Sequence, residues 1–370
     1  MHTSSLPHEW RSESSQKPPK SAVYRREANA AQILKAAHAG EATVWTGDFH
    51  NAKQVLAALK KRVRTPEKCT KPSENSVTGT AALFHRHRMK QSQQSRLINM
   101  LAVEIGANFT LDLPRAPDIA AALADVYGEP NREPFLLPLN RLLGFLGAHE
   151  WHKKGVDIPQ LNGKIHVPFG VFSPLRGEYL DLVWQAPLHP DFQTAFDIGT
   201  GSGILAALLA ERGLNVTGSD NNPRAAACAR ANLAQLGLDN KVRIEETDGF
   251  PEGRADLIVC NPPWLPAKPT SAVETALYDP DSAMLTAFLN GVSAHLNPDG
   301  EAWLIMSDLA EHLGLREPDW LENRITAAGL HIADKLSTKP QHAKAADASD
   351  PLAFARMQET TSLYRLRTAK

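Results

Sequence analysis

Apolar and polar positions alternate in a regular order over the C-terminal half of the chain. From residue 194 onward, short apolar runs bounded by glycine, asparagine or aspartate predict strands, and longer amphipathic runs predict helices. The predicted strands are Ala195–Ile198, Asn215–Ser219, Val242–Glu246, Ala255–Cys260, Glu301–Met306, His331–Leu336 and Ser362–Leu366, and the predicted helices are Gly203–Arg212, Pro223–Leu236, Asp281–His295 and Pro318–Ala328. Strands that alternate with helices predict right-handed crossovers and a mostly parallel sheet covered on both faces. The last two strands have no helix between them, so they are expected to pair as an antiparallel edge.

The N-terminal half also mixes helix and strand patterns, but less regularly. The expected elements, in chain order, are a helix at Ala30–His38, a strand at Thr43–Thr46, an amphipathic helix containing Val55, Leu56 and Leu59, a loop at Thr65–Thr80, a basic helix at about Ala81–Met100, a strand near Phe109–Leu111, a helix through Ala124 with Pro117 in its first turn, and an apolar helix at Phe135–His149. Asn29 is placed to cap the first of these helices and Gly40 to end it. This half is therefore predicted to be a smaller α/β domain.

Changes in pattern divide the chain into four segments. They are a tail at 1–20, an α/β substrate-recognition domain at 21–155, a hairpin with a lead-in helix at 156–186, and the main domain at 187–370. The tail is polar and without periodicity, so it is expected to be disordered. The pair Asn162-Gly163 predicts the hairpin, with strands at Val156–Leu161 and Lys164–Val167, because it supplies the positive φ angles of a type I′ turn. The lead-in helix is expected at Glu178–Trp184, and the main domain should hold a seven-stranded Rossmann-like sheet.

Composition is typical of a soluble globular protein, with 42% hydrophobic and 22% charged residues over 370 positions. No run approaches the ~18 apolar residues of a membrane span, and the first residues have no apolar core of a signal peptide. Cys69, Cys228 and Cys260 lie far apart without ligand spacing, which argues against disulfides and against a structural zinc. His85 and His87 point to different faces of the expected helix, so no metal site is expected. These features predict a cytoplasmic protein that does not enter a membrane.

The net charge of −1 is unevenly distributed along the chain. Between residues 51 and 100, eleven Lys and Arg residues stand against two Glu residues, a net charge of +9 that leaves −10 for the remainder. A basic run of this kind is either a solvated helix face or a contact for a polyanion, because phosphate contacts dominate nucleic-acid affinity. The size of the imbalance makes residues 53–96 a candidate contact with nucleic acid.

A glycine-rich turn follows the first strand of the main domain. The turn contains Gly199, Thr200, Gly201 and Gly203. Its glycines let a ligand approach the backbone at the carboxyl edge of the sheet, where open α/β sheets bind ligands. Ile204 stands where the dinucleotide fingerprint needs its last glycine, which disfavours NAD, and no P-loop Lys-Ser/Thr pair follows. By itself the turn indicates either a nucleoside-like ligand or only a tight connection.

Two acidic positions end the next two strands. Asp220, followed by Asn221, ends the second strand, where a carboxylate can accept hydrogen bonds from both hydroxyls of a ribose. Asp248 and Gly249 follow the third strand, where they are placed to meet an adenine amino group and ring nitrogen. Either aspartate can instead serve as a helix cap or a loop residue. Their position at consecutive strand ends, in line with the glycine turn, favours an adenosine site.

The tetrapeptide Asn261-Pro262-Pro263-Trp264 closes the fourth strand. The lone pair of an exocyclic amine or carboxamide is conjugated into a planar system, so such a nitrogen is a poor nucleophile. The side-chain oxygen of Asn261 and the carbonyl of Pro262 can each accept one N–H, which draws the lone pair out of conjugation and aims it at an electrophilic methyl. The prolines hold these acceptors rigid, and Trp264 offers a face for stacking. The pattern favours catalysis by positioning, without a general base here.

These residues together resemble the motifs of class I S-adenosylmethionine-dependent methyltransferases. The resemblance covers roughly residues 170–370 and runs through Asp197–Gly203, Asp220, Asp248 and Asn261–Trp264. It implies S-adenosylmethionine as the cofactor, with Asp197 and the glycine turn at its methionine end, Asp220 at its ribose and Asp248 at its adenine. Asn221, Gly249 and Asn261 are also expected to contact the cofactor. In this superfamily an (N/D)PP(Y/F/W) tetrapeptide marks enzymes that methylate planar nitrogens.

Two subfamilies are similar to the chain in different places. The first subfamily is the methyltransferase small domain enzymes that modify guanine N2 of ribosomal RNA. Their degenerate first half resembles Val44–Asp48 and Phe84–His87 of this chain. These enzymes have Phe-His after the two prolines, whereas this chain has Trp264-Leu265. The glutamine N5-methyltransferases of release factors and of a ribosomal protein have a hairpin and then Pro-Arg before a helix, similar to Asn162-Gly163 and Pro174–Glu178. They usually carry Tyr in the tetrapeptide.

The expected substrate is a macromolecule. Arg176, Pro263 and Tyr278 are the residues expected to contact it, and the basic segment 53–96 favours a base of ribosomal or other RNA over a protein glutamine. A cofactor-binding assembly factor without catalysis is the alternative from another class, and the intact tetrapeptide disfavours it. A nicotinamide oxidoreductase is disfavoured by the spacing of the glycines.

Overall fold

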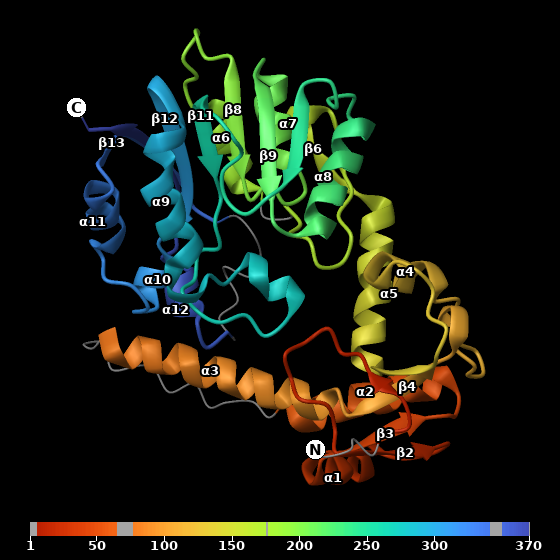
Figure 1. Cartoon of the computed structure of the whole chain (residues 1–370). Helices are drawn as coiled ribbons and strands as arrows, with labels where there is room; N and C mark the ends of the chain where they lie inside the picture. The colour runs from red at the N-terminus through yellow and green to blue at the C-terminus, as the bar shows by residue number, and fades with distance from the viewer. Residues whose placement is uncertain (1–5, 65–76, 175–176, 341–349, 370) are drawn as a thin grey trace. The chain divides into compact units, whose positions relative to one another are not determined.

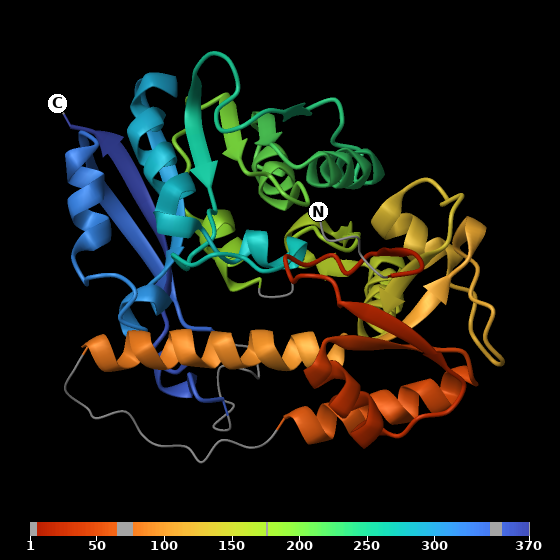
Figure 2. The same cartoon turned by 60° about the horizontal axis from the view of Figure 1, so that its bottom comes forward.

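The computed structural model describes residues 6–64, 77–174, 177–340 and 350–369 (Figure 1). These residues form two compact units. The N-terminal unit contains residues 6–64, 85–153 and 270–272, and the C-terminal unit contains 77–84, 154–174, 177–269, 273–340 and 350–369. Helix α3 (Val77–Ile98) is continuous over 22 residues (Figure 2), and its first eight residues are counted with the C-terminal unit.

A seven-stranded sheet is the centre of the C-terminal unit, with strand order β10-β9-β8-β11-β12-β14-β13 (Figure 1). The strands are β8 Thr194–Ile198, β9 Asn215–Asp220, β10 Val242–Glu246, β11 Ala255–Cys260, β12 Leu296–Ser307, β13 Leu330–Thr338 and β14 Thr361–Thr368. The five strands β8 to β12 are parallel, whereas β14 runs antiparallel to both β12 and β13. The prediction of a mostly parallel Rossmann-like sheet with an antiparallel last strand is confirmed.

Alternate residues of β11 enter two different cores. Leu257 and Val259 belong to one buried cluster with side chains of α6, α7 and α8, whereas Ile258 and Cys260 belong to another with side chains of α9 and α11. The helices are α6 Glu178–Gln185, α7 Ile204–Glu211, α8 Pro223–Gln235, α9 Ala283–His295 and α11 Trp320–Ala327; a single turn, α10 Leu309–His312, and a second one, α12 Ala353–Arg356, complete the unit. Because a strand points successive side chains to opposite faces, this separation shows that helices cover the sheet on both sides.

The N-terminal unit contains a five-stranded sheet with order β1-β5-β4-β3-β2. Its strands are β1 Glu9–Trp10, β2 Ser21–Arg25, β3 Glu41–Trp45, β4 Leu101–Ile105 and β5 Phe135–Pro138, and its further helices are α1 Ala30–Ala39, α2 Phe49–Val63, α4 Ala120–Tyr127 and α5 Leu139–Lys154. Asn29 caps α1 by accepting from the N–H groups of Ala31 and Gln32, and Gly40 ends the helix at φ 84°. Both roles agree with the sequence.

Four expectations for this unit are wrong. Pro117 was expected in the first turn of a helix, but it precedes α4, whose first residue is Ala120. The tail expected to be disordered contains β1, which pairs in parallel with β5 through its backbone and therefore leaves no hydrophobic period in the sequence. The strand expected near residue 110 lies at 101–105 instead, because Asn108 and Phe109 adopt positive φ angles of 57° and 56° in a 3-10 turn. The helix expected from Phe135 begins at Leu139, since the four preceding residues form β5; a short apolar run does not distinguish the two states.

The hairpin is present, but with a different turn. Strands β6 (Val156–Ile158) and β7 (Gly163–Ile165) pair antiparallel, and residues 159–161 form a 3-10 turn between them. Asn162 has φ 45°, whereas Gly163 is the first residue of β7 and has no positive φ, so the turn is not type I′. A Cβ on Gly163 would lie 2.6 Å from Leu236 Cδ2, the end of a flexible side chain that would have to move aside. Among the described helices, none has the length and apolar content to cross a bilayer.

Candidate active site

The glycine turn connects β8 to α7 and needs glycine at three positions. Gly199, Gly201 and Gly203 have φ angles of 71°, 56° and 80°, in the region that side chains rarely adopt. A Cβ on Gly203 would lie 3.1 Å from the Cα of Ala229, so α8 packs directly against the turn. A Cβ on Gly201 would meet only the Gly199 carbonyl oxygen, at 3.9 Å. The space beside Gly201 is therefore open, as a cradle for a ligand requires.

Asp197 holds this turn from inside the protein. Its Oδ2 accepts from Thr200 Oγ1 at 2.6 Å and from the N–H of Ala206 at 3.1 Å. The residue is only 1% exposed, and burial raises the pKa of its carboxyl to about 6, although these two donors act in the opposite direction. Asp197 was expected to line the ligand; its burial instead makes it a positioning residue that fixes the turn and the first turn of α7.

Asp220 lies at the end of β9 with its carboxylate against the glycine turn. Its Oδ2 accepts from the N–H of Gly201 at 3.0 Å, and its Oδ1 accepts from the N–H of Asn222 at 2.9 Å. Burial raises the pKa of Asp220, and the two N–H donors partly offset this. Each carboxylate oxygen keeps a further lone pair, so both can also accept from a diol.

Asp248 and Gly249 lie beside this end of β9, as the sequence predicts. Asn221 Nδ2 donates to Asp248 Oδ1 at 3.0 Å, and Ser219 Oγ donates to the Gly249 carbonyl at 2.6 Å. Asp248 is exposed, so its second oxygen faces solvent. The structure thus brings the glycine turn and both aspartates together at one edge of the sheet.

Strand β11 places Asn261 next to the glycine turn. In the pairing of β11 with β8, Cys260 is the partner of Ile198. Asn261 and Gly199 are the next residues of these two neighbouring strands, so the tetrapeptide and the turn start side by side. Pro262 is buried, and Pro263 is half-buried. This register is the strongest link between the two motifs.

Trp264 contacts Asn261 directly, which the sequence did not indicate. Its indole Nε1 donates to Asn261 Oδ1 at 3.0 Å, and the half-buried ring packs against both core clusters of the sheet. The indole is therefore held by the core and occupies one lone pair of the asparagine oxygen. The second lone pair remains for an incoming N–H.

The connection after the tetrapeptide carries two residues that sequence reasoning missed. Asp279 accepts from the N–H groups of Met284 and Leu285, at 3.0 and 3.1 Å, and so caps α9. The helix begins at Ala283, and not at the expected Asp281, which has φ 56°. The Met284 Cε lies 2.7 Å from where a Cβ of Gly199 would stand, so Met284 borders the turn. Only the folded path of the chain brings it there.

The expected substrate residues are less completely placed. Tyr278 is half-buried and packs against a cluster that contains Leu309 and Leu313. A parallel bridge joins it to Leu265, directly after the tetrapeptide. Arg176 lies outside the described residues. Tyr278 therefore belongs to the connection that follows Trp264, and its contact with a substrate stays a prediction.

A shallow depression of about 310 Å³ lies at the opposite edge of the sheet. Residues from the amino ends of β8, β9 and β10 line it, among them Thr194, Asn215 and Val242. Ligands of open parallel sheets bind at the carboxyl ends of the strands. The depression is therefore not part of the site described above.

Comparison with known proteins gives a match over this region. Residues 164–318 match the family model of the methyltransferase small domain. The resemblance of the motifs is confirmed. The chain is 33% identical over 162 residues to the release factor glutamine methyltransferase of Cereibacter sphaeroides, which covers 40% of this chain and 55% of that protein. It is 32% identical over 241 residues to the ribosomal RNA small subunit methyltransferase C of Salmonella paratyphi B, which covers 60% of this chain and 65% of that protein.

The chain thus spans about half to two thirds of the length of these curated relatives. A solved S-adenosylmethionine-dependent methyltransferase from Clostridium acetobutylicum shares 14% sequence identity, with 62% of this chain and all of that chain covered and a TM-score of 0.39. The fold assignment rests on the strand order itself, in which β14 is inserted antiparallel beside β12.

Proposed function

We propose that the chain is an S-adenosylmethionine-dependent methyltransferase that acts on a planar exocyclic amine or amide nitrogen of a macromolecule. The observation that carries the proposal is the register of β8 and β11, which sets the glycine turn beside Asn261. A nucleoside cradle and a pair of N–H acceptors then share one edge of the sheet. The family match over residues 164–318 supports the same activity.

The residues present fit this cofactor. The space beside Gly201 is open, the carboxylate of Asp220 keeps lone pairs that can accept from a diol, and exposed Asp248 can accept from an adenine amino group. Gly199, Thr200 and Gly203 complete the turn, and Asn221 fixes Asp248. When bound, S-adenosylmethionine supplies an electrophilic methyl group on its sulfonium.

The chain's own residues then position the acceptor nitrogen. Asn261 Oδ1 accepts one N–H with its second lone pair, and the Pro262 carbonyl accepts the other, so that the nitrogen lone pair is drawn out of conjugation. These acceptors are rigid because Pro262 and Pro263 fix φ and the indole N–H of Trp264 fixes the amide of Asn261. Catalysis is therefore by orientation in a preorganised site.

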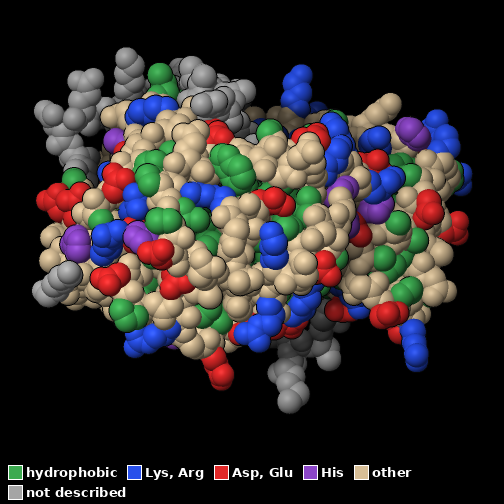
Figure 3. Space-filling model, turned by 90° about the horizontal axis from the view of Figure 1, so that it is seen from above, with side chains coloured by type: hydrophobic (Ala, Val, Ile, Leu, Met, Phe, Trp, Pro, Cys, Tyr) green, Lys and Arg blue, Asp and Glu red, His purple; other side chains and the backbone are tan. Residues whose placement is uncertain are grey.

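RNA is the substrate class that the charge distribution favours. Lys53, Lys61, Arg62 and Arg64 are exposed on or directly after α2. Burial and the neighbouring Arg64 lower the pKa of Lys60, so cations are crowded in this turn. By contrast, Lys and Arg side chains are interspersed with Asp and Glu over the face drawn in Figure 3. A phosphate backbone would relieve the repulsion between these cations.

A protein glutamine is the second candidate, because one relative is a release factor glutamine methyltransferase. A glutamine amide presents the same two N–H groups to Asn261 and Pro262 as a base amine does. The site chemistry therefore fits both, and the charge of α2 is the feature that separates them.

The deciding experiment is transfer of labelled methyl from S-adenosylmethionine into extract of a strain that lacks this gene. We expect RNase to remove the label and protease to leave it. Removal by protease and not by RNase would identify a protein substrate, as the glutamine alternative requires. Asn261→Ala should lower incorporation by about 10²- to 10³-fold, while Asn240→Ala, which changes an exposed asparagine at the opposite edge of the sheet, should not lower it. Cofactor binding by calorimetry without incorporation into any fraction would favour the non-catalytic assembly factor.

A further inference from the structure

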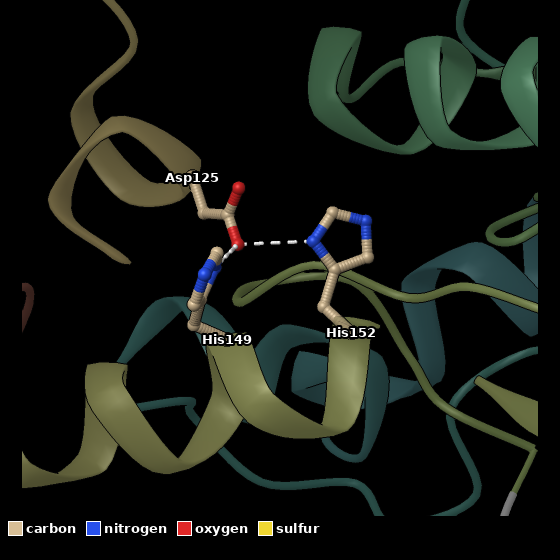
Figure 4. A group of neighbouring side chains, drawn as sticks. All are labelled: Asp125, His149 and His152. Atoms are coloured by element: carbon tan, nitrogen blue, oxygen red, sulfur yellow. Dashed lines mark hydrogen bonds and ion pairs between the residues drawn. The ribbon is translucent and has the colours of Figure 1, made fainter. Parts of the chain in front are cut away.

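A carboxylate and two imidazoles meet in the N-terminal unit, away from the motifs used so far. Asp125 lies on α4, and His149 and His152 lie one turn apart on α5 (Figure 4). Asp125 Oδ2 is 2.7 Å from His149 Nδ1 and 2.9 Å from His152 Nδ1. The three atoms all lie within 4.8 Å of one another. A single oxygen thus faces two ring nitrogens from a neighbouring helix.

We infer that Asp125, His149 and His152 bind a zinc ion that ties α4 to α5. Two imidazole nitrogens and one carboxylate oxygen are a donor set that suits zinc, whereas magnesium and calcium prefer oxygen ligands alone. Zinc–ligand bonds of about 2.0–2.1 Å in a tetrahedron separate ligand atoms by roughly 3.3 Å. The two nitrogen–oxygen distances therefore need to widen by only about half an ångström, which small side-chain rotations supply.

The surroundings of the cluster fit a bound ion with one open position. The side chains of Asp125, His149 and His152 are 21%, 18% and 32% exposed, so the cluster is sheltered but reachable by water. Water can then be the fourth ligand. Both imidazoles must present the Nδ1 lone pair to the metal, which places the ring proton on Nε2.

Helix geometry explains why the two histidines converge. Residues three apart on a helix share one face, so both rings of α5 reach the same carboxylate on α4. His149 and His152 thus have the spacing of a ligand pair, unlike His85 and His87. The inferred site differs from the expectation of no metal site, because that expectation was based only on the cysteines and on His85 and His87. The histidine pair becomes a candidate site only together with Asp125, which lies 24 residues before His149 in the sequence.

The competing account is a pair of N–H···O hydrogen bonds without any ion. Calorimetric titration of chelator-treated full-length protein with zinc chloride separates the two. We expect one zinc per chain, no response to magnesium, and an affinity at least about 100-fold weaker in Asp125→Asn or His149→Gln. The matched control is His38→Gln, which changes an exposed histidine of the same unit and should bind as the wild type.

A measurement on the wild type keeps the inference testable if a variant fails to fold. Zinc should shift the Nδ1 resonances of two histidines in an ¹⁵N-labelled sample, and cobalt should give the visible absorption of a tetrahedral site. Absence of stoichiometric zinc binding, or equal binding by wild type and His149→Gln, would overturn the inference.

Discussion

The hydrogen bond from Trp264 to Asn261 gives the sharpest test of the site, because its donor can be removed while an aromatic ring is kept. Replacing Trp264 by Phe keeps an aromatic ring but removes the N–H that lies 3.0 Å from Asn261 Oδ1. A neutral hydrogen bond of this kind is worth about 1 kcal/mol. If that energy serves to orient the amide in the transition state, kcat should fall about fivefold.

The assay is steady-state methyl transfer with the RNA or protein fraction that accepts the label. Asn261→Ala removes the acceptor itself and should lower kcat by about 10²- to 10³-fold, the range for loss of one preorganised polar group in an active site. KM for S-adenosylmethionine should change little in either variant, since Asp220 and the glycine turn are untouched.

The double variant decides whether Trp264 acts through Asn261. In the Asn261→Ala background, Trp264→Phe should have no further effect on kcat, because the oxygen that it orients is absent. A full additional fivefold loss would refute the positioning role and assign Trp264 to stacking alone. The indole packs against both core clusters, and a smaller ring weakens this packing. Thermal unfolding of each variant therefore measures the loss of stability separately from the loss of activity.

Three further predictions follow from the structure. Folding raises the pKa of Asp197 to about 6 from an ordinary 3.8, so the protonated carboxyl stabilises the folded state. This contribution is fully present below about pH 4 and is lost as the pH rises through about 6. Asp197→Asn should remove this part of the pH dependence of the unfolding free energy, on the order of 3 kcal/mol, in denaturant titrations. Gly203→Ala should destabilise the protein by about 1–3 kcal/mol and by more than Gly213→Ala, which also has positive φ but meets nothing within 4 Å; equal effects would exclude the contact with Ala229. Replacing Lys60, Lys61 and Arg62 by Gln should reduce the slope of log K for RNA binding against log salt concentration by about 2–3. The control Lys35→Gln should leave this slope unchanged. An unchanged slope in the triple variant would argue for the protein substrate.

The seven-stranded sheet and its longer helices could be predicted from the sequence because each of these elements carries its own signal, whereas the single turns α10 and α12 were not expected. Buried strands such as Ala255–Cys260 are continuous apolar runs, and each ends at a polar residue on the carboxyl edge. Since parallel strands bring these ends together, the sequence alone predicts that Asp220, Asp248 and Asn261 share one site.

The N-terminal unit was less predictable because its strands depend on pairing. The two residues of β1 form a strand only through the backbone of β5, and the apolar run Phe135–Pro138 continues directly into a helix that begins with Leu139, so no pattern marks where the strand ends. The Trp264–Asn261 hydrogen bond and the approach of Met284 to Gly199 also left no pattern, because they depend on how side chains meet after the sheet has formed.

The register of β8 and β11 explains why the cofactor cradle and the N–H acceptors stay aligned. Shifting β11 by one residue would send Leu257 and Val259 into the core that now holds Ile258 and Cys260. Ile258 and Cys260 would in turn enter the core that now holds Leu257 and Val259. Helices cover both faces, so such a shift would have to repack both cores at once. The hydrophobic cores therefore fix the position of Asn261 relative to Gly199. The packing beneath these two residues therefore sets the precision that the proposed methyl transfer demands of them.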